Sequence, residues 1–206
     1  MGFYRDHVVP RLVNWTCSGR GMDRWRARAC EGLAGSVVEI GFGSGTNVKH
    51  YPPTVQHVYA VEPSSLARKL ARPKIGESTI EITYAGLDGH AIDLANESCD
   101  GALCTFTLCT LDDPQRALQE LWRILKPGAT LHFLEHGISP DAPVAKWQHR
   151  LDGLEQRLAD GCHLTRDPVG LMTQAGFEMK SCQQRYVRGP KPWCYFSAGV
   201  CVKPAP

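Results

Sequence analysis

The sequence predicts an α/β domain in which a parallel sheet carries helices on both faces. Short apolar runs alternate with helical patterns between residues 35 and 177, and parallel strands need such crossover connections. The last two runs, 177–187 and 193–203, have no helix between them and are separated by Gly189-Pro190. These two observations predict a parallel sheet that ends in an antiparallel hairpin.

The first half of the chain contains three predicted strands. "SVVEIGFGSG" (36–45) is a β-branched run that ends in glycines, so we expect a buried strand followed by a turn. "HVYAVEP" (57–63) predicts a second strand that ends at Pro63. "STIEITYAG" (78–86) alternates apolar and polar residues, which predicts a third strand. "SSLARKLAR" (64–72) reads as a helix with a serine cap.

The second half continues the alternation. The apolar run at 99–111 predicts a fourth strand that is buried on both faces. "DDPQRALQELWRILKPG" (112–128) predicts a helix that ends at Pro127-Gly128, and "ATLHFLEHG" (129–137) then predicts a fifth strand. Two further helices are expected at 142–160 and 166–177.

The fifth strand contains His-x-x-Glu-His, a pattern that on a helix is typical of zinc proteases. On a strand, His132 and His136 lie about 13 Å apart. They cannot share a zinc ion whose ligands lie at about 2 Å. We therefore predict no metal site from this pattern and expect the sheet to satisfy His132. Glu135 and His136 end the strand, where open α/β sheets bind ligands.

Composition excludes several classes of protein. The formal net charge is +2 and no long basic run occurs, so we expect no nucleic-acid partner. No stretch approaches the roughly 20 apolar residues of an integral membrane segment, and the first residues do not resemble a secretion signal. The nine cysteines form no Cys-x-x-Cys pair and mostly lie in apolar runs. They are therefore expected to be reduced, buried thiols of a cytoplasmic protein. Oligomeric state stays open.

The turn after the first strand, "VEIGFGSGTN", carries three glycines within five residues. Glycine allows a sharp turn and lets a ligand approach bare backbone. The spacing Gly41-x-Gly43-x-Gly45 differs from the G-x-G-x-x-G of dinucleotide-binding proteins, so we expect no pyrophosphate there. Glu39, just before the loop, is placed to accept a hydrogen bond from an ammonium group.

Two further carboxylates follow strands of the same sheet. Glu62 ends the second strand, 21 residues after Gly41, where a carboxylate can accept two hydrogen bonds from a ribose diol. Asp88 follows the third strand and is placed to meet an adenine amino group. The order of loop and carboxylates predicts a nucleoside ligand.

The stretches "VVEIGFGSGTN", "VEP" and "DDPQRALQELWRILKPG" and the closing hairpin resemble the class I S-adenosylmethionine-dependent methyltransferases. The resemblance covers nearly all of the chain after residue 34. It implies a Rossmann-like seven-stranded sheet of order 3-2-1-4-5-7-6 with strand 7 antiparallel. It also implies S-adenosyl-L-methionine as cofactor and S-adenosyl-L-homocysteine as its product. The cofactor contacts that we expect are Glu39, Gly41, Gly43, Ser44, Gly45, Asn47, Glu62, Pro63, Leu87, Asp88 and Thr105.

Three more stretches, "CTFTLCTLDDP", "FLEHG" and "DGCHLTRDP", are similar to the group of methyltransferases that includes thiol S-methyltransferases. This resemblance implies an enzyme that methylates a small apolar acceptor, a thiol by preference. Quinone C-methylation and phospholipid N-methylation are the alternatives, and a cofactor-binding interaction module without catalysis is the alternative of another class. Mammalian members carry a hydrophobic amino-terminal anchor that we do not find here, which implies a soluble form.

Methyl transfer requires an acceptor held in line with an activated methyl group, and a thiol needs little help from a base. His136 is the preferred base or thiolate partner, with Glu135 and His163 as further catalytic candidates. Backbone hydrogen bonding at the sheet end is the alternative role for His136, and loop capping is the alternative for His163. Residues 1–34 are predicted to form a helical lid over a methyltransferase domain at 35–206.

Overall fold

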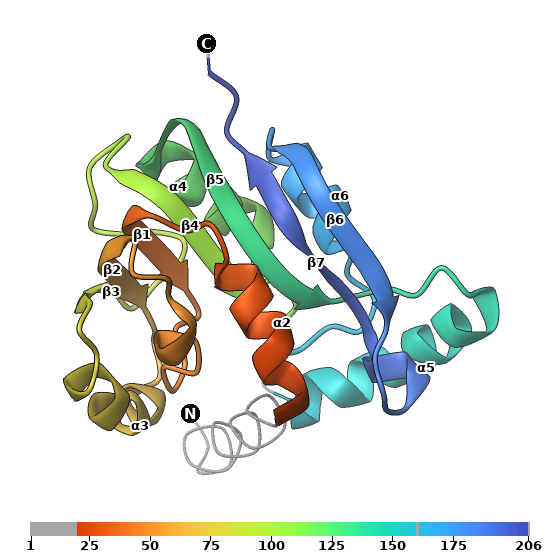
Figure 1. The fold of residues 1–206 in the computed structure, drawn as a ribbon. Helices are drawn as coiled ribbons and strands as arrows, with labels where there is room; N and C mark the ends of the chain where they lie inside the picture. Colours follow the sequence, from red (N-terminus) through yellow and green to blue (C-terminus); the bar gives the residue numbers. More distant parts are fainter. Residues whose placement is uncertain (1–19, 160, 206) are drawn as a thin grey trace.

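The protein is described by a computed structural model, which describes residues 20–159 and 161–205. Its strands form one seven-stranded sheet in the order β3-β2-β1-β4-β5-β7-β6 (Figure 1). β7 runs antiparallel to both of its neighbours. The predicted sheet order and the antiparallel final hairpin are therefore confirmed.

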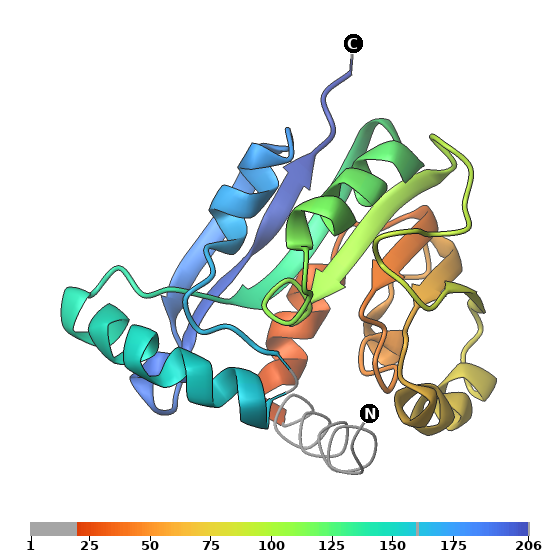
Figure 2. The ribbon, with the colours of Figure 1, turned by 180° about the vertical axis from the view of Figure 1, so that it is seen from behind.

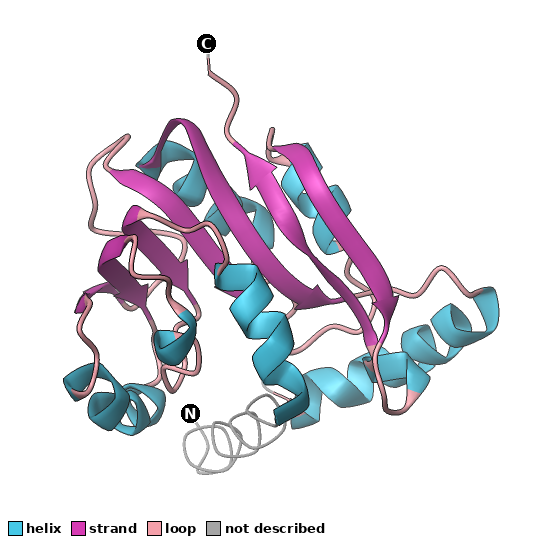
Figure 3. Ribbon diagram, viewed as in Figure 1, coloured by secondary structure: helices cyan, strands magenta, loops and turns pink. Residues whose placement is uncertain are grey.

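The elements follow the predicted alternation (Figure 3). The strands are β1 (Gly35–Ile40), β2 (Val55–Val61), β3 (Glu81–Gly86), β4 (Cys99–Thr105), β5 (Leu125–His136), β6 (Glu178–Tyr186) and β7 (Tyr195–Val202). The α-helices are α2 (Arg20–Cys30), α3 (Ser65–Gly76), α4 (Pro114–Ile124), α5 (Ala142–Leu158) and α6 (Pro168–Gln174). Two 3-10 turns complete them, η2 (Val48–His50) and η3 (Lys191–Trp193).

Register brings the carboxyl ends of the central strands to one edge of the sheet. Ile40, the last residue of β1, pairs with Val61 at the end of β2 and with Cys104 near the end of β4. Thr105 in turn pairs with Leu134 of β5. Because all of these pairs are parallel, the segments that follow β1, β2, β4 and β5 leave the sheet together.

Two apolar layers hold the helices against the sheet. Figures 1 and 2 show α2 on one face and α4 and α6 on the other. The layer under α4 and α6 includes Leu121 and Met172, and the opposite layer includes Trp25 of α2. Both faces of the central strands are thus buried, as their continuous apolar runs predict.

The helix before β5 ends earlier than the sequence predicts. The predicted end was Pro127-Gly128, but α4 ends at Ile124, and Leu125 already has extended backbone with φ −71° and ψ 136°. Leu125 pairs with Cys99 of β4, so the sheet takes over at this point. Because Pro127 disfavours helical backbone at the residue before it, the chain gains nothing by continuing the helix.

The tryptophans divide between the core and the surface. Trp25 is buried and packs edge-on against Phe196 at 6.0 Å between ring centroids. Trp147 and Trp193, by contrast, lie at the surface, with exposed fractions of 55% and 38%. Trp147 lies on α5, and Trp15 lies outside the described residues.

The described cysteines are free thiols, and most are buried. Cys162 is partly exposed, Cys182 is exposed, and Cys17 lies outside the described residues. This agrees with the predicted reduced, largely buried thiols. Within the same ranges, each helix is too short or too polar to cross a membrane.

Candidate cofactor and acceptor site

The glycine loop after β1 adopts the backbone that only glycine adopts freely. Gly41, Gly43 and Gly45 have φ of 71°, 58° and 70°. A Cβ on Gly41 would lie 2.0 Å from Oγ1 of Thr107, so the loop after β4 passes directly against it. For a Cβ on Gly43, the nearest atom among the described residues would be the Gly41 carbonyl oxygen, at 3.8 Å. The loop therefore packs on one side and offers bare backbone on the other.

Glu62 is held beside this loop at the end of β2. Its Oε2 accepts a hydrogen bond from the Gly43 amide at 2.7 Å, and its Oε1 accepts one from the Ser64 amide at 2.8 Å. The side chain is 7% exposed, so its orientation is set by the backbone around it. The exposed Pro63 follows it directly. Both residues thus lie at the carboxyl edge, as predicted.

The segment after β3 offers an apolar side chain next to a charged one. Leu87 is 55% exposed, unusually open for leucine. The Asp88 carboxylate accepts a hydrogen bond from the His90 amide and lies 2.8 Å from the His90 ring. The hydrogen bond from the His90 amide lowers the pKa of Asp88, so the carboxylate is ionised at neutral pH. An apolar surface with a fixed acceptor beside it suits a purine base.

A buried polar network lies behind the glycine loop and joins α2 to the sheet. Arg26 donates to Oδ1 of Asn47 at 2.8 Å and to Oγ1 of Thr105 at 3.0 Å. Asn47 donates to Oε1 of Glu39 at 2.7 Å, and the Tyr51 hydroxyl donates to Oε2 of Glu39. All five side chains are at most 8% exposed. The sequence predicts Glu39, Asn47 and Thr105 as site residues, whereas Arg26 and Tyr51 are recognised only in the structure.

Burial dominates the electrostatics of Glu39. Loss of solvent raises the pKa of this carboxyl to about 7, although the hydrogen bonds from Tyr51 and Asn47 and the charge of Arg26 oppose the rise. Because Glu39 is fully enclosed and both of its oxygens accept hydrogen bonds inside the protein, it faces a ligand only through Asn47. Ser44 is also buried, and its carbonyl accepts from Lys74 at 2.6 Å.

A cavity of about 490 Å³ lies on the far side of the glycine loop. Its walls come from Gly45, from the segment around η2 and from the chain between Lys74 and Ile80. It does not include Glu62, Leu87 or Asp88. The cavity therefore differs from the place where these three residues are predicted to hold a nucleoside.

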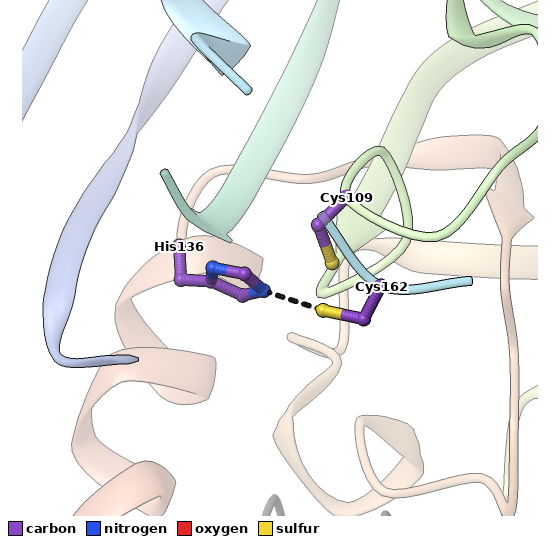
Figure 4. Close-up of side chains that lie close together, drawn as sticks. All are labelled: Cys109, His136 and Cys162. Atoms are coloured by element: carbon purple, nitrogen blue, oxygen red, sulfur yellow. Dashed lines mark hydrogen bonds between the residues drawn. The ribbon is translucent and has the colours of Figure 1, made fainter. Parts of the chain in front are cut away.

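A second group of side chains gathers beyond the ends of β4 and β5 (Figure 4). His136 ends β5, Cys109 lies in the loop after β4, and Cys162 lies in the segment after α5. Nε2 of His136 lies 3.0 Å from Sγ of Cys162, and the ligand atoms of all three residues lie within 4.8 Å of one another. Three distant parts of the chain thus bring one imidazole and two thiols together.

Charge in this cluster is shared between Cys109 and His136. A hydrogen bond from Cys162 lowers the pKa of the Cys109 thiol well below its usual range, and the charge of His136 lowers it further. Burial lowers the pKa of His136, but the neighbouring Cys109 thiolate outweighs it and raises the pKa to about 9. The pKa of Cys162 is strongly raised because its thiol donates to Cys109. Without a bound metal ion, this arrangement favours a thiolate at Cys109 beside an imidazolium at His136.

Glu135 points the other way and holds the loop after β4. Its Oε1 accepts hydrogen bonds from the amides of Thr107 at 2.8 Å and Leu108 at 3.1 Å. Burial raises the pKa of Glu135 to about 8. Oε2 of Glu135 and Nδ1 of His136 are buried atoms without a hydrogen-bond partner within residues 20–159 and 161–205. Buried polar atoms are nearly always hydrogen-bonded, and a bound substrate would supply the missing partner of these two atoms.

The remaining candidates of the "DGCHLTR" stretch take structural positions. Nδ1 of His163 lies 3.2 Å from Oδ2 of Asp152 on α5. Arg166 donates to the carbonyl of Leu108 and forms no ion pair with Asp167 in the described part of the chain. Asp160 lies outside that part. Among the described residues of this stretch, Cys162 is the one that joins the group around His136.

The fold and the glycine loop match a known family model. The model described as "Methyltransferase domain" matches residues 38–133, which run from β1 through most of β5. This stretch contains Glu39, the glycine loop, Glu62, Leu87, Asp88 and Thr105. Together with the sheet order and the structural likeness below, this match shows that residues 38–133 form the core of a methyltransferase domain.

Two kinds of methyltransferase are among the proteins that are similar in sequence. The chain is 32% identical to thiol S-methyltransferase TMT1A of Homo sapiens over 165 residues, which cover 77% of this chain and 65% of that protein. It is 29% identical to the ubiquinone/menaquinone biosynthesis C-methyltransferase UbiE of Syntrophotalea carbinolica, over 84% of this chain and 83% of that one. The chain spans 55% to 65% of the length of the thiol S-methyltransferases that it matches.

A solved structure confirms the fold. An S-adenosylmethionine-dependent methyltransferase from Thermotoga maritima superposes with a TM-score of 0.68 at 25% identity. The likeness covers 96% of this chain and 99% of that one. The family therefore implies S-adenosylmethionine as cofactor. The bare backbone at Gly43, the oriented carboxylate of Glu62 and the open apolar face of Leu87 fit this cofactor.

Proposed function

We propose that this chain transfers a methyl group from S-adenosylmethionine to a small thiol. The observation that carries the proposal is the partly buried His136, whose buried Nδ1 has no hydrogen-bond partner among the described residues. It lies at the end of β5, two strands from the glycine loop. The similarity to thiol S-methyltransferases supports the same acceptor.

The cofactor supplies a methyl group on a positively charged sulfur, which makes it an activated donor when bound. In the proposed arrangement, Glu62 accepts hydrogen bonds from the ribose, while Leu87 and Asp88 contact the adenine. The bare backbone of the glycine loop and Asn47 face the methionine end. The contribution of Glu39 is to orient Asn47, because its own oxygens are enclosed.

A thiol acceptor needs less activation by the protein than a carbon or nitrogen acceptor does. A free thiol with a pKa of about 8.5 is a few per cent thiolate at neutral pH and is strongly nucleophilic. His136 lies beside the expected position of the acceptor, and a positive charge held at this place would raise that fraction. Glu135 then serves as a positioning residue, because its carboxylate shapes the loop after β4. His163 contributes through its bond to Asp152 rather than through the substrate.

We propose a role as a lid for the described part of the amino-terminal segment, which is α2. Residues 1–19 lie outside the described chain, but α2 packs over β4, β5 and β7 and sends Arg26 to Asn47 and Thr105. A helix that contributes a buried cation beside the expected methionine end supports a covering role for this segment.

Quinone C-methylation is the second candidate. The observation that favours it is the likeness to the UbiE protein, which extends over 83% of that protein. A non-catalytic cofactor-binding module would share the nucleoside surface but not turn over.

The test incubates the protein with S-adenosylmethionine and separate acceptors, and quantifies S-adenosylhomocysteine. The acceptors are small thiols, a reduced quinone and phosphatidylethanolamine. We expect turnover with thiols, and we expect His136→Ala to lower it by about 10²- to 10⁴-fold with cofactor affinity kept. His149→Ala, on the exposed side of α5, is the matched control. Turnover with the reduced quinone alone would refute a thiol as the acceptor. Cofactor binding without turnover of any acceptor would favour the non-catalytic binding module.

A further inference from the structure

We infer that Cys109, His136 and Cys162 bind one zinc ion through two sulfurs and one imidazole nitrogen. The fourth coordination position stays open and takes the sulfur of the acceptor. This deepens the proposed function and rests on it for the identity of the acceptor, whereas the metal site itself stands on the geometry of the three side chains.

The donor atoms are of the right kind and nearly at the right spacing. Zinc binds thiolate sulfur at about 2.3 Å and imidazole nitrogen at about 2.0–2.1 Å in a tetrahedral arrangement, which places the donors about 3.5–3.8 Å apart. Here Nε2 of His136 and Sγ of Cys162 are 3.0 Å apart, and no pair of donors exceeds 4.8 Å. Movements of about 1 Å or less would therefore complete the coordination.

The backbone holds the three ligands together without help from a metal. The amide of His163 donates to the carbonyl of Cys109 at 2.8 Å, which ties the segment of Cys162 to the loop after β4. The amide of Ile138 donates to the carbonyl of Arg166 at 2.8 Å, which ties that segment to the end of β5. A Cβ on Gly137 would lie 2.6 Å from that carbonyl oxygen, so this approach requires glycine beside His136.

Charge at the site also fits a bound dication. Two thiolates and zinc together are neutral, and an acceptor thiolate would add one negative charge. Arg166, held against the carbonyl of Leu108, supplies the balancing positive charge near the two cysteines. Soft sulfur ligands select zinc over hard cations such as magnesium or calcium.

Three protein ligands characterise a catalytic zinc site, whereas structural sites use four. The cluster lies beyond β4, and β4 is the direct neighbour of β1 and its glycine loop. Thr107, two residues before Cys109, packs against Gly41 of that loop. The open position therefore lies next to the proposed cofactor surface, where an acceptor must be held for methyl transfer.

The reaction balances as a displacement at carbon. The acceptor thiol loses its proton to solvent when its sulfur binds zinc, because zinc ligands must be deprotonated. The acceptor sulfur then forms a bond to the methyl carbon while the bond from that carbon to the sulfonium sulfur breaks. The electron pair of the broken bond stays on the departing sulfur. The methylated product is a neutral thioether and so a weaker ligand that leaves the metal.

The test measures metal binding and activity separately on the full chain. Fully reduced protein is stripped with chelator and titrated with Zn²⁺, and the same protein is loaded with Co²⁺ to record sulfur-to-metal charge-transfer absorption. We expect one equivalent of zinc, a cobalt spectrum typical of tetrahedral thiolate coordination, and a change of that spectrum when a thiol acceptor is added. Cys162→Ser should weaken zinc binding by at least about 100-fold, while the exposed Cys182→Ser should not change it.

The outcomes separate the site from the reaction. Absence of stoichiometric zinc binding, or equal zinc affinity of Cys162→Ser and the wild type, would overturn the metal site. Full thiol methylation by metal-free protein would also overturn it and would leave the proposed function intact. Zinc binding that is lost in Cys162→Ser, together with no methylation of any thiol, would keep the site and refute the thiol acceptor.

Discussion

Substitutions at two glycines of the loop after β1 should separate an effect on stability from an effect on cofactor binding. In Gly41→Ala, the new Cβ would lie 2.0 Å from Oγ1 and 2.6 Å from Cγ2 of Thr107, at a φ of 71°. Left-handed backbone costs about 1–2 kcal/mol for a residue with a Cβ, and overpacking adds about 1–3 kcal/mol. The free energy of unfolding should therefore fall by about 2–5 kcal/mol.

Gly43→Ala is the matched comparison in the same loop. Its φ of 58° carries the same backbone cost, but its Cβ meets nothing closer than 3.8 Å, so we expect a loss of only about 1–2 kcal/mol. The added methyl group lies on the bare side, where it should obstruct S-adenosylmethionine. Urea unfolding measures the stabilities and calorimetry the cofactor affinity. Equal destabilisation, or unchanged cofactor affinity in Gly43→Ala, would refute the assignment of the two sides of the loop.

Three further predictions concern the buried polar groups. The pKa of Glu39 is raised in the folded state, so the folded protein keeps a proton that the unfolded chain releases. The free energy of unfolding should therefore decrease by on the order of 3 kcal/mol as pH rises from about 4.5 to 7. Glu39→Gln should flatten this pH dependence in urea unfolding, and an unchanged slope would contradict the assignment. Glu135→Ala leaves two buried amides without an acceptor and should cost about 2–6 kcal/mol, whereas Glu135→Gln keeps an acceptor and should cost less; equal losses in thermal unfolding would count against the loop-holding role. Arg26→Lys should weaken S-adenosylmethionine binding about tenfold or more while adenosine, which lacks the methionine end, binds as before; parallel losses for both ligands in calorimetry would show a purely structural role.

The sequence was sufficient for the sheet and for the loop because both depend on local pattern. The glycines of the loop and the carboxylate at the end of β2 lie close to the strands that position them. The exclusion of a shared zinc between His132 and His136 is also supported, because His132 turns to the carbonyl of Ala29 and to Thr130 instead. The end of α4 was misplaced because sheet pairing of Leu125 competes with helical periodicity there.

The parts of the site that depend on distant contacts could not be read from the sequence. Arg26 sits on an exposed-looking basic helix, and only the packing of α2 against the sheet sends its side chain to Asn47. Cys109 and Cys162 are separated by a strand and two helices, and no spacing rule connects them to His136. Their meeting follows from the crossover topology, which brings the ends of β4 and β5 together.

The most direct test of the account is a crystal structure with S-adenosylhomocysteine bound. We predict that the ribose hydroxyls bond to Glu62, that the adenine lies against Leu87, and that the sulfur faces the group of Cys109, His136 and Cys162. Binding in the cavity beside Lys74, or with the sulfur turned away from that group, would contradict the proposed methyl transfer at this site.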